Sequence, residues 1–293
     1  MDDCTDSLEQ RHVAAVSRAT QADGVGLLVI GHGTADPGGA EETRAVARGV
    51  AAALPGAAVE LGFLEVIGPS IADAMRALAN RGCRRAVAMP LLLFTAGHAR
   101  RDVPDALHEA AVALGMEVTQ AAALGCHPAV VELSRRRRAE AVAGKQPVPA
   151  EDTVLAMLGR GSSAGDGIAQ FRQFVAASLV GDAVVDARFE IGFAAAARPS
   201  LDEAVEAAAR RRPRRVIVQP HLLFGGHVEN QVTDAVARAR LAHPRIEWIQ
   251  SPRLGVDGLV ARALVDRALE AAEHAKFPGI RFFAGKNVSP ADE

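Results

Sequence analysis

Two histidines, His32 and His98, are the residues whose type and setting best suit chemistry. Each follows a short apolar run of the chain, at residues 27–30 and 86–93, and each has glycine beside it. A neutral imidazole binds divalent transition metals, and it also accepts a proton near neutral pH. The neighbouring glycines leave room for a flat or bulky ligand to approach the backbone. The pair therefore indicates a site that can hold a metal ion and remove protons.

The elements around these histidines follow a strand–helix alternation. In the first half we expect strands at about residues 27–30, 59–64, 86–93 and 116–121, with helices at 41–54, 70–80, 103–114 and from 128 onward. Strands that alternate with helices predict right-handed crossovers and a parallel sheet. If the strand order is 2-1-3-4, the first and third strands are neighbours, and ligands bind beyond the carboxyl ends of such strands. We then expect both imidazoles to face one crevice.

The second half of the chain repeats the first. Gly62-Phe63 returns as Gly192-Phe193, which is 130 positions later (192 − 62). The Pro-Leu-Leu-Leu-Phe run at 90–94 returns as Pro-His-Leu-Leu-Phe at 220–224, with the same offset. A period of this length indicates tandem domains rather than a solenoid. We therefore expect two α/β domains, each with a parallel sheet flanked by helices, at 24–145 and 151–275, followed by a tail at 276–293.

Three segments, in order and at matching spacing, resemble the motifs of the sirohydrochlorin chelatases of the CbiX and SirB type, the class II chelatases. The segments are Gly31-His32-Gly33-Thr34, Gly62-Phe63-Leu64-Glu65 followed by Pro69-Ser70, and residues 90–94 followed by Gly97-His98. The resemblance covers about residues 26–272 and matches the long, internally duplicated form of that family. It implies two flavodoxin-like halves with a tetrapyrrole bound between them.

The resemblance also implies roles for particular residues. The histidines that match His32 and His98 bind the divalent metal substrate, Co²⁺ or Fe²⁺, and accept the protons that leave the pyrrole nitrogens. Glu65, in the second motif, is a candidate relay for those protons. No organic cofactor is expected, because the ring nitrogens of the tetrapyrrole themselves drive insertion. The choice between cobalt and iron stays open, since imidazole and carboxylate accept both metals.

The two halves differ at the positions that carry this chemistry. Arg160 stands where the first half has His32, and Ala195 aligns with Glu65. We therefore place the metal chemistry in the first half. Arg160, a permanently charged planar donor, suits a carboxylate of the substrate. Further candidates for that role are Arg100 and Arg101.

Two histidines of the second half have weaker signals. His227 is a near-counterpart of His98, and it could be a ligand, a substrate contact or a relic. His221 follows proline within an apolar run, which favours a buried imidazole with satisfied hydrogen bonds.

Composition and charge limit the partners and the compartment that we expect for the protein. The formal net charge is -2, which gives no overall positive field for nucleic acid or an anionic membrane. The three cysteines are far apart and form no CxxC pair, so neither a disulfide framework nor a thiolate zinc site is expected. The sequence has no signal-peptide pattern and no run of about 20 apolar residues. We expect a cytoplasmic monomer or homodimer without nucleic-acid or membrane partners.

Two other functions remain as alternatives. A histidine after the first strand also occurs in phosphoryl-transfer enzymes with an Arg-His-Gly motif, but here Gly31 precedes His32 and the anion clamp is missing. A non-enzymatic carrier of metal or tetrapyrrole would use the same residues for binding without turnover. Tight product binding without multiple turnover would favour the carrier.

Overall fold

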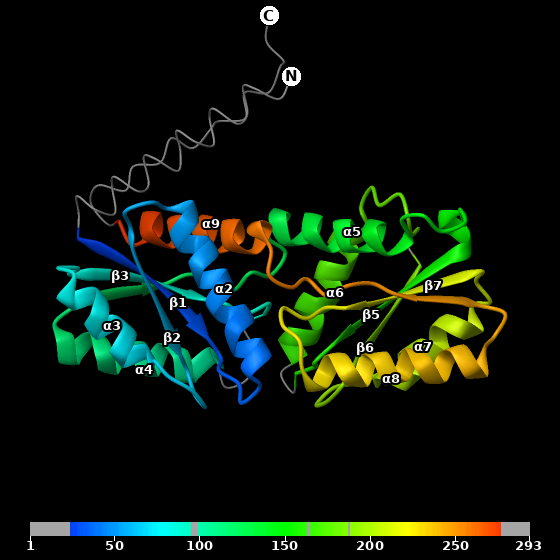
Figure 1. The fold of residues 1–293 in the computed structure, drawn as a ribbon, viewed down its shortest axis with the longest axis horizontal. Coiled ribbons are helices and arrows are strands. Elements are labelled where there is room, and N and C mark those ends of the chain that lie inside the picture. The colour runs from blue at the N-terminus through cyan, green and yellow to red at the C-terminus, as the bar shows by residue number, and fades with distance from the viewer. Residues whose placement is uncertain (1–23, 95–98, 163–164, 187, 277–293) are drawn as a thin grey trace, which may run out of the picture.

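The computed structural model describes residues 24–94, 99–162, 165–186 and 188–276, and it contains two parallel four-stranded sheets (Figure 1). The strand orders are β2-β1-β3-β4 and β6-β5-β7-β8. The predicted order 2-1-3-4 is thus confirmed in both halves, as are the two tandem α/β units. The first and third strands of each half are hydrogen-bonded neighbours, which brings their carboxyl ends together.

The first half contains β1 (Val25–Gly31), α2 (Pro37–Ala53), β2 (Ala58–Phe63), α3 (Ile71–Asn80), β3 (Arg85–Pro90), α4 (Ala99–Leu114), β4 (Glu117–Gln120) and α5 (Pro128–Val142). The second half contains a short 3-10 helix (Ala150–Asp152), β5 (Thr153–Gly159), α6 (Gly165–Leu179), β6 (Phe189–Phe193), α7 (Leu201–Arg210), β7 (Arg215–Pro220), α8 (His227–Ala242), β8 (Glu247–Gln250) and α9 (Gly258–His274).

Local sequence explains where these elements begin. Every residue of the central strands β1 and β5 is buried, as expected for apolar strands covered by helices on both faces of a parallel sheet. Ser70 forms a reciprocal capping box with Asp73 at the start of α3, and Ser200 forms the same box at the start of α7. Helix α2 begins four residues before the predicted position 41, because the Asp36 side chain accepts a hydrogen bond from the Gly39 amide and Pro37 suits the first turn.

The last helix of each half packs on the other half. Helix α9 contacts α2, β3 and β4 of the first half, whereas α5 contacts α6 and β8 of the second half. In Figure 1, α9 accordingly lies beside the first sheet and α5 beside the second. The expected domain limits follow the repeat along the chain, but in space each sheet receives a helix from the opposite half.

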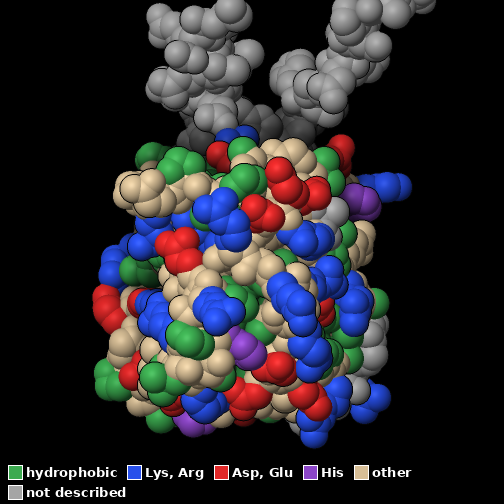
Figure 2. Space-filling view, turned by 90° about the vertical axis from the view of Figure 1, so that its right-hand side faces the viewer, with side chains coloured by type: hydrophobic (Ala, Val, Ile, Leu, Met, Phe, Trp, Pro, Cys, Tyr) green, Lys and Arg blue, Asp and Glu red, His purple; other side chains and the backbone are tan. Residues whose placement is uncertain are grey.

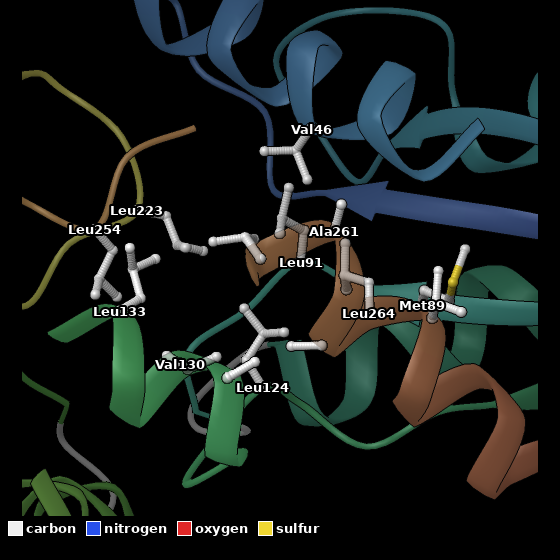
Figure 3. Close-up of a cluster of buried hydrophobic side chains, with 14 of the residues drawn as sticks. Val46, Met89, Leu91, Leu124, Val130, Leu133, Leu223, Leu254, Ala261 and Leu264 are labelled. Carbon is white, nitrogen blue, oxygen red and sulfur yellow. The ribbon is translucent and has the colours of Figure 1, made fainter. Parts of the chain in front are cut away.

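One apolar core joins the two halves through these exchanged helices (Figure 3). Ala261 and Leu264 of α9 lie close to Met89 and Leu91 of the first half. On the other side of the cluster, α5 packs its apolar face toward second-half residues. The labelled side chains there are Val130, Leu133, Leu223 and Leu254. Because the cluster is continuous, we infer that the halves fold against one another rather than as independent bodies.

Helix α5 also reaches the second half through a buried polar cluster. The fully buried Arg138 guanidinium lies 2.6 Å from the Asp182 carboxylate and 2.7 Å from the side-chain amide oxygen of Gln219. The equivalent positions in α9 and the first sheet, 130 residues away (268 − 138 and 219 − 89), are Ala268 and Met89. The contact of α5 with the second sheet therefore includes a buried ion pair, whereas Ala268 and Met89 make the equivalent contact of α9 with the first sheet apolar.

The end of the molecule that the second half forms carries cationic and anionic side chains mixed together (Figure 2). In the segment 210–215 at the start of β7, Arg211 contacts Glu190 at 2.6 Å and Arg215 contacts Glu247 at 2.8 Å. Such pairing offsets much of the arginine charge of this segment. Among the described residues, none of the helices combines the length and apolar character needed to cross a bilayer.

Candidate functional site

His32 and Glu65 lie side by side at the carboxyl edge of the first sheet. The parallel pairing of β1 and β2 continues past the strand ends, because the Leu64 amide donates to the Gly31 carbonyl at 2.9 Å and the Glu65 amide donates to the His32 carbonyl at 3.1 Å. The side chains then meet, with 3.1 Å between His32 Nε2 and Glu65 Oε1. Their side chains are 38% and 57% exposed, so the pair is open to a ligand.

Gly33 permits this close approach of the two strand ends. Its φ is +96°, and a Cβ built at this position would lie only 1.9 Å from the Glu65 carbonyl oxygen. The second half repeats the geometry, because Gly161 has φ +92° and its Cβ would lie 1.9 Å from the Ala195 carbonyl oxygen. Any residue larger than glycine at position 33 would displace the segment that carries Glu65.

A small depression adjoins the His32 side chain. Its lining is apolar apart from the imidazole and consists of Ile30, Gly31, His32, Leu64, Leu92 and Val103. An imidazole at such a wall can bind a metal through one ring nitrogen, and a carboxylate at the other nitrogen fixes the tautomer and raises the basicity of the ring. Alternatively, the carboxylate can take up a proton that the imidazole has accepted.

The other predicted ligand, His98, lies outside the described residues. Phe94, four residues earlier, is described, and its ring packs against Phe171 and His221 of the second half. The strand that leads to it, β3, is the hydrogen-bonded neighbour of β1. Within the described part of the chain, there is no group of three or more metal-binding side chains. The convergence of His32 and His98 therefore stays a prediction, while the neighbouring positions of His32 and Glu65 are observed.

The second half presents a cation at the place of His32. Arg160 is exposed, and the Ala195 amide donates to its carbonyl at 3.0 Å, as Glu65 does to His32. No acid stands opposite Arg160 here, because Ala195 replaces the glutamate. Arg101 is exposed on the first turn of α4, whereas the side chain of Arg100 is not among those described. These observations leave the carboxylate-binding roles of the three arginines as predictions.

His221 is buried as expected, but its hydrogen bonding is not satisfied. The ring is 4% exposed, with its centroid 4.2 Å from that of Phe174 and 5.3 Å from those of Phe94 and Phe171. Among described residues, Nε2 has no hydrogen-bond partner. Burial lowers the pKa of His221 to about 3, because an aromatic cage cannot solvate the charged imidazolium. His227, by contrast, is exposed at the first position of α8.

A polar bridge between the halves was not predicted from the sequence. Glu42 on α2 accepts a hydrogen bond from the Gly225 amide at 2.9 Å and pairs with Arg253. Arg253 also pairs with Glu229 at 2.9 Å. Glu42 and Arg253 are far apart in the chain, and no local pattern marks such a contact. The bridge ties the helix that follows β1 to loops at the carboxyl edge of the second sheet.

Fold and site together define a class of protein, a duplicated α/β chain with an imidazole–carboxylate pair at the strand ends of one half only. The chain belongs to the CbiX family, whose family model matches residues 26–141 and 154–271. The sirohydrochlorin cobaltochelatase of Priestia megaterium is 26% identical over 250 residues, which are 84% of this chain and 80% of the relative. The sirohydrochlorin ferrochelatase of the same organism is 28% identical over 235 residues, which are 80% and 85% of the two chains.

A solved structure agrees with the family assignment. SirB from Bacillus subtilis with Fe³⁺ superposes with a TM-score of 0.75 at 25% sequence identity, covering 86% of this chain and 98% of SirB. The likeness therefore covers both halves rather than a single α/β unit.

Proposed function

We propose that this protein inserts Co²⁺ or Fe²⁺ into sirohydrochlorin in the cytoplasm. The observation that carries the proposal is the His32–Glu65 pair, which stands open at the carboxyl edge of the first sheet of a CbiX-family fold. Named relatives of similar length include both a cobaltochelatase and a ferrochelatase, so both metals are kept as substrates.

In the proposed mechanism, His32 and His98 hold the incoming metal above the ring, and each imidazole nitrogen that the metal vacates accepts one of the two protons that leave the pyrrole nitrogens. Glu65 takes a proton from His32, which its 3.1 Å separation allows. As the ring nitrogens replace the imidazoles, the metal passes into the macrocycle. Arg160, with Arg100 and Arg101, binds peripheral carboxylates of the ring. No organic cofactor has a part in these steps.

The test is metal insertion into sirohydrochlorin under anaerobic conditions, followed by absorbance, with Co²⁺ and Fe²⁺ compared. We expect His32→Ala and His98→Ala each to lower kcat by about 100-fold or more, and Glu65→Gln by a smaller factor of about 10, as for groups that orient or relay. His108→Ala is the matched control, since His108 is exposed on α4.

Insertion at the wild-type rate by the His32→Ala/His98→Ala double variant would contradict the mechanism. One equivalent of tightly held product without further turnover would instead identify a carrier.

A further inference from the structure

Arg44 lies against the residues that shape the His32–Glu65 pair. Its neighbour Thr43 packs on the end of β1, where a Cβ built on Gly31 would lie 2.8 Å from the Thr43 methyl and 3.0 Å from the Phe63 ring. The Arg44 guanidinium carbon lies 5.7 Å from the centre of the Phe63 ring. The Phe63 ring thus packs against Gly31, the residue before His32, and the Arg44 cation lies over the same ring.

The charge of Arg44 is only weakly offset by acids. Its ion pair with Glu41 is long, at 3.9 Å, whereas Arg48 contacts the same carboxylate at 2.7 Å. The Arg44 side chain is 40% exposed. Since Glu41 is engaged by Arg48, the guanidinium of Arg44 retains donors for an external carboxylate.

Arg172 stands at the position of the second half that corresponds to Arg44. Phe171 packs on the end of β5, where a Cβ built on Gly159 would lie 3.4 Å from its ring, as Thr43 packs on the end of β1. The offsets agree, since 171 − 43 and 159 − 31 are both 128. Arg172 therefore takes the place of Arg44 on α6. It is exposed, and no ion pair to another described residue holds it.

We propose that Arg44 and Arg172 bind peripheral carboxylates of the tetrapyrrole, one arginine from each half. A planar guanidinium binds a carboxylate through two parallel hydrogen bonds, which fixes orientation as well as affinity. Two such contacts at pseudo-equivalent places would seat a polycarboxylate ring across both strand-end edges, beside the metal site of the first half. The inference rests on the proposed function, because it assigns specificity to the same site.

The test measures the Kd of metal-free sirohydrochlorin by fluorescence quenching, together with KM and kcat for insertion. We expect Arg44→Gln and Arg172→Gln each to raise Kd and KM about tenfold, as for loss of a charge-assisted contact, with kcat changed about twofold or less. Arg44→Lys should lie between wild type and Arg44→Gln, because it keeps the charge without the planar fork. The control is Arg84→Gln, because Arg84 is exposed at the amino end of β3, at the opposite edge of the first sheet, and this variant should bind as wild type.

If Arg44→Gln and Arg172→Gln bind the tetrapyrrole as tightly as Arg84→Gln, the proposed contacts are wrong. Lost affinity in Arg44→Gln with a lowered Tm, together with wild-type affinity in Arg172→Gln, would also overturn the proposal, since the loss would then be structural. The proposed function fails on a separate result, namely insertion that survives loss of His32 and His98.

Discussion

Gly33 is the residue that sets the spacing of the His32–Glu65 pair. Its missing side chain lets the Glu65 backbone approach to a distance that a Cβ would block, and its φ of +96° disfavours every other residue. Gly82 offers a comparison, since it has φ +85° but open space around the position of a Cβ. Comparing the same substitution at Gly33 and Gly82 therefore separates the effect of backbone conformation from the effect of close contact.

We predict that Gly82→Ala lowers the free energy of unfolding by about 1 kcal/mol, the cost of a left-handed alanine. Gly33→Ala should cost more, at about 2–4 kcal/mol, and should also abolish most insertion activity, because the Glu65 segment must move. Urea titrations and insertion assays of both variants check this. Equal stability losses with activity retained in Gly33→Ala would show that the close approach does not matter.

His221 should make stability depend on pH. Its pKa is about 3 when folded against an ordinary value of 6.5, so between these values the unfolded chain binds a proton that the folded protein does not. The contribution to stability is thus present above about pH 6.5 and is lost as pH falls toward 3. His221→Leu, which copies Leu91 of the first half, should lessen the fall in Tm between pH 6.5 and 4.5. Parallel Tm curves for this variant and wild type would contradict the prediction, and His108→Leu is the control.

At the scale of elements, helix α5 depends on a buried ion pair that α9 lacks. Arg138 and Asp182 have side-chain exposures of 0% and 2%, so removing one partner leaves a buried charge without compensation. We predict that Arg138→Met lowers the free energy of unfolding by about 3–5 kcal/mol. The double variant Arg138→Met/Asp182→Leu should regain much of that loss, because the equivalent contact around Met89 and Ala268 is apolar.

Urea unfolding of Arg138→Met, Asp182→Leu and the double variant gives the coupling free energy between the two charges. Additive losses would mean that the pair contributes no specific interaction. The Arg138 charge has its acidic partner, Asp182, only in the second half. Packing of α5 on the first sheet would place that charge against the apolar side chains of Met89 and Leu91, so the ion pair also disfavours that arrangement.

The elements were largely predictable, and their long-range contacts were not. Apolar runs and the strand–helix alternation predicted the strands, the helices and the parallel order, because each depends on residues close together in the sequence. The 130-residue repeat predicted that the second half has the same elements. The exchange of α5 and α9, and the Glu42–Arg253 bridge, depend on packing between distant segments. For the same reason Arg44 had no sequence signal, since its setting comes from the Phe63 ring.

The whole molecule makes one site from two unequal copies of a fold. The first half carries His32 and Glu65, and the second carries Arg160 without an acid opposite it. The exchanged helices and the Glu42–Arg253 bridge connect the two sheets, so the half that carries Arg160 is fixed relative to the half that carries His32 and Glu65. In the proposed mechanism, one half of the chain supplies the metal ligands and the other half supplies carboxylate contacts.

The central claim is that two imidazoles, those of His32 and His98, hold the same metal ion. X-ray absorption of the Co²⁺-loaded protein tests it most directly, because imidazole scattering reports the number of histidine ligands. Shared coordination by His32 and His98 should give a signal for about two imidazoles in the wild-type protein, reduced to about one in either single alanine variant and lost in the double variant. An imidazole signal that is unchanged in the double variant would contradict it.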